Sequence, residues 1–171
     1  GIGVLSAALK KDALSADGYA QMINITTQLN TPGPDLSKLE GVHALTDITG
    51  FGLAGHSLEM ARGAKAAIRI DMVHVPLLPG VRELAAQGMV TGASGRNWAG
   101  YGHEVTLGSG LQQVDQALMS DPQTSGGLLV ACSADSVPEV LAIFQRHGFN
   151  QAAEVGEIVA GGADGVRLQV V

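Results

Sequence analysis

One segment joins an acidic residue to a glycine-rich turn. It runs from Thr46 to His56 with the sequence TDITGFGLAGH and follows a predicted strand over 42–46. A helix start offers free N–H groups, and glycines let the backbone approach an anion, so this arrangement favours phosphate binding. Asp47 adds a hard carboxylate oxygen, the ligand type that Mg²⁺ prefers. The structural alternative is that Asp47 only caps the turn and that the glycines serve helix–strand packing.

The same glycines also match a second pattern. Gly50, Gly52 and Gly55 fit G-x-G-x-x-G, and Asp71 follows at about the distance of the acidic ribose ligand in dinucleotide-binding folds. However, the preceding strand carries polar residues, and Asp47 would place a carboxylate beside the pyrophosphate. The strand that holds Asp71 alternates polar and apolar residues, unlike a central parallel strand. A NAD(P)-binding domain is therefore the weaker interpretation.

Two further segments carry groups that suit an anion. Met119 to Gly127 reads MSDPQTSGG, in which Asp-Pro starts a turn and the hydroxyls of Thr124 and Ser125 can donate to a phosphate. Gly92 to Tyr101 contains Arg96, whose guanidinium pairs bidentately with oxyanions. A simple structural turn and an ordinary surface arginine are the respective alternatives.

Histidine and cysteine chemistry is less promising. The single cysteine, Cys132, excludes an internal disulfide and a cysteine-rich zinc site. It falls in the apolar run 128–132, so we expect it to be buried with a raised thiol pKa. His56 lies one helical turn beyond the glycines, where it would either face a ligand or pack against the strand.

Composition excludes several classes of protein. The 171 residues carry a formal net charge of −6 and only 4% aromatic residues, which speaks against a nucleic-acid binder. No apolar run reaches the ~18 residues that a membrane helix needs. We therefore expect a cytoplasmic protein without a nucleic-acid or membrane partner. Because the chain begins at Gly1, directly in an apolar stretch, we also expect it to be a fragment.

The elements that must position these groups follow from hydrophobic periodicity. We expect the Asp71 strand to comprise 68–72, and the stretch 91–110 to be irregular with a short strand near 103–106. The run 128–132 is expected to be a strand covered on both faces. Together the elements predict an α+β fold in one domain, 1–171. The predicted strands are 1–5, 42–46, 68–72, 128–132, 154–159 and 166–170, and the predicted helices are 17–30, 51–62, 79–87, 111–119 and 137–147.

Three segments in their order and spacing resemble selenophosphate synthetases (selenide, water dikinases). They are TDITGFGLAGH over 46–56, ASGRN over 93–97 and DPQTSGGLL over 121–129, and the opening GIGVL resembles the family's entry into its second domain. The pairing of TDITGFG with DPQTSGG separates this family from aminoimidazole ribonucleotide synthetase, thiamine monophosphate kinase and a hydrogenase maturation factor.

The resemblance implies a C-terminal domain with a mixed β-sheet and helices packed on one face as a two-layer sandwich. The intact family makes selenophosphate, AMP and phosphate from selenide, ATP and water, requires Mg²⁺ and forms a homodimer. Its reactive cysteine or selenocysteine and its lysine belong to an N-terminal domain absent here, so we expect this fragment to be inactive alone and to hold no catalytic residue.

The site residues implied by the resemblance lie in the cleft that the two domains enclose. Asp47 would be a metal ligand. The expected nucleotide-binding residues are Asp47, Thr49, Gly50, Gly52, Arg96, Asn97, Thr124 and Ser125. Two alternatives stay open: a related ATP-dependent synthetase or kinase of the aminoimidazole ribonucleotide synthetase type, and a non-catalytic interaction module.

Overall fold

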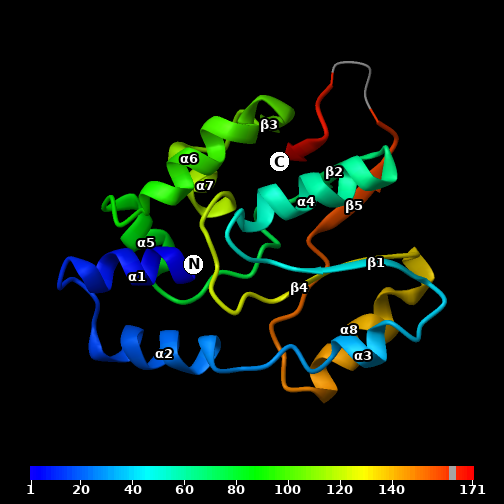
Figure 1. Cartoon of the computed structure of the whole chain (residues 1–171), viewed down its shortest axis with the longest axis horizontal. Coiled ribbons are helices and arrows are strands. Elements are labelled where there is room, and N and C mark those ends of the chain that lie inside the picture. Colours follow the sequence, from blue (N-terminus) through cyan, green and yellow to red (C-terminus); the bar gives the residue numbers. More distant parts are fainter. Residues whose placement is uncertain (162–164) are drawn as a thin grey trace.

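The computed structural model describes residues 1–161 and 165–171 (Figure 1). Its helices are α1 Ile2–Lys10, α2 Ala16–Thr26, α3 Gly33–Leu36, α4 Gly52–Ala64, α5 Val81–Ala86, α6 Gly92–Tyr101, α7 Gln113–Met119 and α8 Val137–Arg146, with short 3₁₀ turns η1 Gly102–Glu104 and η2 Ala134–Ser136. Its strands are β1 Val42–Asp47, β2 Ala67–Ile70, β3 Val105–Leu107, β4 Leu128–Cys132, β5 Gly156–Val159 and β6 Leu168–Val170.

The strands form two separate sheets. One is mixed, in the order β3-β6-β2-β5, with β6 parallel to both β3 and β2 and with β5 antiparallel to β2. The other is the antiparallel pair of β1 and β4, in which Asp47 lies opposite Leu128. The predicted α+β class and the mixed sheet are confirmed. The separate pairing of β1 and β4 was not predicted.

The main core lies between α4 and the mixed sheet. Leu58 of α4, Ile70 of β2 and Leu168 of β6 are almost fully buried in it. The predicted apolar stripe of α4 is confirmed for Ala54 and Leu58, and each fully buried large aliphatic side chain contributes roughly 1.5–3 kcal/mol. Phe51 was expected on the same stripe but precedes the helix and is 53% exposed.

Helices α3 and α8 lie beside the β1–β4 pair (Figure 1), and a second, smaller core fills the space between them. Leu36 of α3 and Val140, Ile143 and Phe144 of α8 are buried there, against β1 and β4. Gly148 has φ +85°, the left-handed conformation that commonly ends a helix, which agrees with the predicted end of α8.

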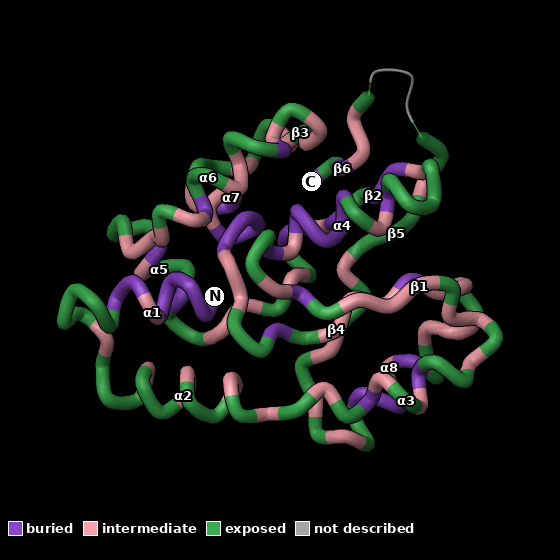
Figure 2. Tube along the Cα trace, in the orientation of Figure 1, coloured by how far each residue is buried: buried purple, intermediate pink, exposed green. Residues whose placement is uncertain are grey.

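The predicted strand at residues 1–5 is wrong, because these residues begin α1. Ile2, Val4 and Leu5 are all buried, and a short run that is apolar on every side does not distinguish a buried strand from a buried helix. Helix α2 also ends earlier than expected. None of its residues is buried (Figure 2), and Met22 and Ile25 pack against the core while Tyr19 is 48% exposed.

The expectation of an irregular stretch at 91–110 is also wrong. It contains α6, η1 and β3, and only the short strand there was anticipated. The Thr91 side chain accepts a hydrogen bond from the Ser94 amide at 3.2 Å and caps α6. The buried Ser94 hydroxyl lies 2.7 Å from that of Ser120 after α7, so tertiary contacts hold a helix that its glycines disfavour.

Strand β4 is not covered on both faces as expected. Only Ala131 of its five residues is buried, because a two-stranded sheet has few neighbours. Cys132 is consequently half-buried rather than buried. The expected direction of its pKa is correct, since desolvation raises the pKa of the thiol. Among the described helices, none combines the length and the apolar character needed to cross a bilayer.

Candidate functional site

The turn from β1 into α4 carries the predicted phosphate-binding residues. Asp47 is the last residue of β1 and is exposed, and Gly50 is exposed in the turn. Helix α4 begins at Gly52 without a side-chain cap and without an acidic residue in its first turn. The Gly52 amide already donates to the Thr49 carbonyl at 3.1 Å, so the N–H groups that follow Gly52 in this first turn are the ones that an anion beside the Asp47 carboxylate could reach.

The three glycines of the turn have different physical roles. Gly52 has φ +71°, and a Cβ there would lie 2.8 Å from the backbone carbon of Ser120. A Cβ on Gly55 would lie 2.4 Å from that of Phe51. Nothing lies within 4 Å of the Cβ position of Gly50. Packing inside the chain thus explains Gly52 and Gly55, while Gly50 leaves space through which a ligand can reach the backbone.

The DPQTSGG segment lies directly against this turn. The Ile48 amide donates to the Gly127 carbonyl at 2.9 Å, and the Gln123 amide donates to the Thr49 carbonyl at 3.0 Å. Thr124 and Ser125 lie between these two contacts and are exposed, with Ser125 at φ +50°. Their hydroxyl-bearing turn therefore borders the one that carries Asp47.

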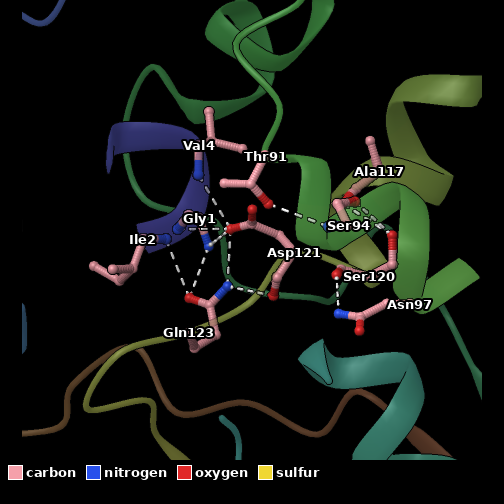
Figure 3. A network of polar contacts seen from close by, with 11 residues as sticks. Gly1, Ile2, Val4, Thr91, Ser94, Asn97, Ala117, Ser120, Asp121 and Gln123 are labelled. Carbon is pink, nitrogen blue, oxygen red and sulfur yellow. Dashed lines mark hydrogen bonds and ion pairs between the residues drawn. The ribbon is translucent and has the colours of Figure 1, made fainter. Parts of the chain in front are cut away.

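The third predicted segment also reaches the turn, through Asn97. Its side-chain amide donates to the carbonyls of Gly50 at 2.8 Å and Ser120 at 3.1 Å, as Figure 3 shows for Ser120. Arg96 precedes it on α6 and is exposed. Asn97 thus joins α6 to the glycine turn, while the Arg96 side chain lies in solvent.

Asp121 has a role that the sequence did not reveal. Its carboxylate is fully buried, and Oδ2 accepts hydrogen bonds from the amides of Gly3 at 3.0 Å and Val4 at 3.3 Å (Figure 3). The Gln123 Oε1 atom accepts from the Ile2 amide at 3.1 Å. These side chains cap α1, whose first residues provide no cap of their own. Gly1 has no side chain with which to cap α1, and this feature could have indicated a cap from a distant residue.

A chain of polar contacts runs inward from Thr49. The Thr49 hydroxyl lies 3.1 Å from Nε2 of His56, and Nδ1 of the same ring lies 2.8 Å from the Glu59 carboxylate. The His56 ring is buried and tilted against Phe51, with ring centroids 5.9 Å apart. His56 therefore contacts Thr49 of the turn and Glu59 of its own helix, an arrangement that neither sequence-based alternative described.

The arrangement fits one carboxylate ligand for a cation. Over residues 1–161 and 165–171, no group of three or more His, Cys, Asp or Glu side chains is placed to hold a metal ion. Mg²⁺ is usually bound through one or two carboxylates together with water and substrate phosphates. The exposed Asp47 carboxylate suits a site of this kind.

A cavity of about 1120 Å³ lies behind the turn, between the two sheets and α2. Its lining includes Ile25, Ile70, Leu129 and Phe144. These apolar walls do not suit phosphate.

Comparison with known proteins defines the class. Residues 1–169 match the family described as AIR synthase related protein, C-terminal domain, and the chain belongs to this family. The hydrogenase maturation protein HypE of E. coli has a similar fold, with a TM-score of 0.57 at 20% identity over 82% of this chain and 34% of that chain. HypE in complex with ATP gives a TM-score of 0.59 at 19% identity over 83% and 36%.

Curated relatives indicate a more specific class of protein within this family. The selenide, water dikinase of Burkholderia pseudomallei is 63% identical over 163 residues, which cover 95% of this chain and 46% of that protein. The selenide, water dikinase of Rhizobium meliloti is 47% identical over 95% of this chain and 47% of that protein. The chain spans about half the length of the curated relatives it matches. The expected resemblance is confirmed.

Proposed function

We propose that this chain is the C-terminal domain, a single unit over 1–171, of a selenide, water dikinase. In the whole protein it would bind the phosphates of ATP and contribute Asp47 to a Mg²⁺ site. Support comes from relatives of that name at 47–63% identity. One structural observation carries the proposal: the exposed Asp47 carboxylate lies beside the uncapped start of α4, in a turn that both other motifs contact.

The proposed reaction converts selenide, ATP and water into selenophosphate, AMP and phosphate. The backbone N–H groups that follow Gly52 at the start of α4 would bind phosphate oxygens, and the Asp47 carboxylate would hold the Mg²⁺ that accompanies the nucleotide. When bound, Mg²⁺ supplies neutralisation of the phosphate charge during in-line transfer. The exposed side chains of Arg96, Thr124 and Ser125 would contact phosphate oxygens.

The remaining catalytic groups belong to the part of the relatives that this chain does not span. We propose that a reactive cysteine or selenocysteine and a lysine lie there, and that the fragment is inactive alone. Cys132 does not replace that nucleophile, because its thiol pKa is raised by desolvation. A homodimer and a cytoplasmic location stay predictions.

The test compares full-length parent protein with its Asp47→Ala variant. Phosphorus NMR with ATP, Mg²⁺ and selenide is expected to show selenophosphate and AMP for the parent and neither product for Asp47→Ala. The control is Asp135→Ala, which removes an exposed carboxylate from η2, three residues after Cys132, beyond the end of the β1–β4 pair that is opposite to Asp47. Formation of ADP, or ATP consumption without any requirement for selenide, would favour a synthetase of the aminoimidazole ribonucleotide type instead.

A further inference from the structure

We propose that His56, held by Glu59, is a positioning residue that determines the polarity of the Thr49 hydroxyl. The contact chain makes Thr49 donate its proton inward to His56, so that the hydroxyl presents only lone pairs outward, toward the cation and its bound water. This inference rests on the proposed function, because it assigns a task within the same nucleotide site.

The first step is the direction of the hydrogen bond between His56 and Glu59. The two atoms are 2.8 Å apart, and an ionised carboxylate only accepts hydrogen bonds. The proton must therefore be on Nδ1. In the neutral ring, Nε2 is then an acceptor. The ring is buried while the Glu59 carboxylate is half-exposed, so Glu59 stays hydrated as it orients a ring that water does not reach.

The second step is the hydroxyl of Thr49. Its oxygen lies 3.1 Å from Nε2, which as an acceptor requires the hydroxyl proton. The Thr49 carbonyl is already occupied by the amides of Gly52 at 3.1 Å and Gln123 at 3.0 Å. The Thr49 hydroxyl thus keeps the two lone pairs on its oxygen and no free proton.

The consequence is a division of tasks around the turn. A hydroxyl without a free proton repels a phosphate oxygen but accepts from a cation-bound water or contacts the cation itself. The N–H groups at the start of α4 have the opposite polarity and suit phosphate. Asp47 and Thr49 therefore form the cation side of the turn, and the α4 start forms its phosphate side.

The same chain contains a matched control for a merely structural role. His147 lies 3.0 Å from the Thr31 hydroxyl and 3.0 Å from the Asp35 carboxylate, in the region where α3 meets α8. The residue types are similar, but the adjoining helix α3 has only four residues, and neither contact involves the turn that carries Asp47. Variants of this second chain report what losing such contacts costs the fold alone.

The first test observes the parent protein, and a variant serves only to assign the signals. Imidazole nitrogen NMR of the full-length protein at alkaline pH, assigned with His56→Phe, is expected to show a protonated Nδ1 and an unprotonated Nε2 for His56. A neutral ring with its proton on Nε2 would overturn the proposal, because Thr49 would then accept from His56 and keep its own proton free.

The second test is a double-mutant cycle in the full-length protein. Binding of a non-hydrolysable ATP analogue is measured by calorimetry as a function of Mg²⁺ concentration. We expect Thr49→Val and His56→Phe each to raise the half-saturating Mg²⁺ concentration by about tenfold. The double variant should show no further increase, because His56 acts through the same hydroxyl. Thr49→Ser should stay near the parent value.

The outcomes separate this inference from the proposed function. If Asp47→Ala leaves the Mg²⁺ dependence unchanged, the proposed function fails. If Asp47→Ala abolishes it while His56→Phe does not alter it, or if the two effects multiply in the double variant, only the positioning role fails. His147→Phe and Thr31→Val should lower thermal stability without altering the Mg²⁺ dependence. Should His56→Phe not fold, His56→Gln with Thr49→Val completes the cycle.

Discussion

A Cβ atom on Gly126 would lie 1.8 Å from the carbonyl oxygen of Ile48. The two residues belong to two of the three motifs that meet at the site, and here the two turns lie in direct contact. No side chain fits between them, because the clash is with backbone and not with the flexible end of a side chain. The DPQTSGG segment therefore requires glycine at this position for assembly of the site, whatever it contributes to a ligand.

Gly126→Ala should accordingly separate the two turns. We expect it to lower the free energy of unfolding by about 1–3 kcal/mol, as overpacking does elsewhere, and to weaken nucleotide binding. Gly127→Ala is the matched control, since nothing lies within 4 Å of its Cβ position and the residue is exposed. Urea unfolding of both variants checks this, and equal stability of the two would contradict the assembly role.

Asp121 should matter to the fold rather than to the ligand. Asp121→Ala leaves the amides of Gly3 and Val4 without their acceptor in a buried place. We expect the free energy of unfolding to fall by about 2–3 kcal/mol. Asp17→Ala, which removes an exposed carboxylate on α2, serves as the control. Unchanged stability combined with lost nucleotide affinity would instead identify Asp121 as a ligand-binding residue.

Tyr101 should make stability fall at high pH. Its hydroxyl donates to the Phe51 carbonyl at 2.7 Å, and burial raises the pKa of the phenol above its ordinary value of 10.0. Above that value the unfolded chain loses a proton that the folded protein keeps, so ionisation favours the unfolded state. Thermal unfolding at increasing alkaline pH should show this loss in the parent and a smaller one in Tyr101→Phe.

At neutral pH Tyr101→Phe should cost about 1 kcal/mol, since the Phe51 carbonyl loses its donor. Tyr19→Phe is the control, because Tyr19 is 48% exposed. The same alkaline slope in the parent and in Tyr101→Phe would show that another group causes it.

Loss of the Glu104 contribution should make the stability of the protein fall at acidic pH. Hydrogen bonds from Arg62 lower the pKa of the Glu104 carboxyl below 4.5, and Arg167 lies 3.6 Å away. The contribution is present above the unfolded pKa and is lost as pH falls through the lower folded value. Acid titration of stability should be shallower in Glu104→Gln than in the parent, whereas exposed Glu83→Gln should leave the curve unchanged.

Asp47→Ala should leave the fold intact. The side chain is exposed at the end of β1, so we expect a change in the free energy of unfolding within about 0.5 kcal/mol. Circular dichroism and urea unfolding check this directly. Loss of folded structure would mean that the carboxylate caps the turn, which is the structural alternative that the sequence left open.

The hydrophobic periodicity of the sequence was sufficient to predict those helices and strands that bury one face. Helix α4 with Leu58, strand β2 with Ile68 and Ile70, and α8 with Phe144 were all predicted close to their observed bounds. Helix α1 was missed because its cap is Asp121, 118 positions from Gly3. Helix α6 was missed because its glycines predict a loop, and the contact of Ser94 with Ser120 is not visible in a local pattern.

The site, too, was predictable only as far as local sequence patterns reach. Its three motifs were identified from residue types, and the structure does bring them to one turn. Which residues serve the fold and which remain free was not predictable, since this depends on contacts between motifs. Asn97 illustrates the point, because its amide is committed to the Gly50 and Ser120 carbonyls. The contacts of Thr49 with His56 and Glu59 were likewise beyond a reading of spacing alone.

The pairing of β1 with β4 has a consequence for biosynthesis. Val42 pairs with Cys132, and Asp47 with Leu128, so the strand that ends in the site has no partner until much later residues have been made. Such distant contacts slow folding, because a long loop must close before they form. During translation the turn at Asp47 leaves the ribosome well before β4, and the nascent site stays unassembled until the chain extends past Cys132.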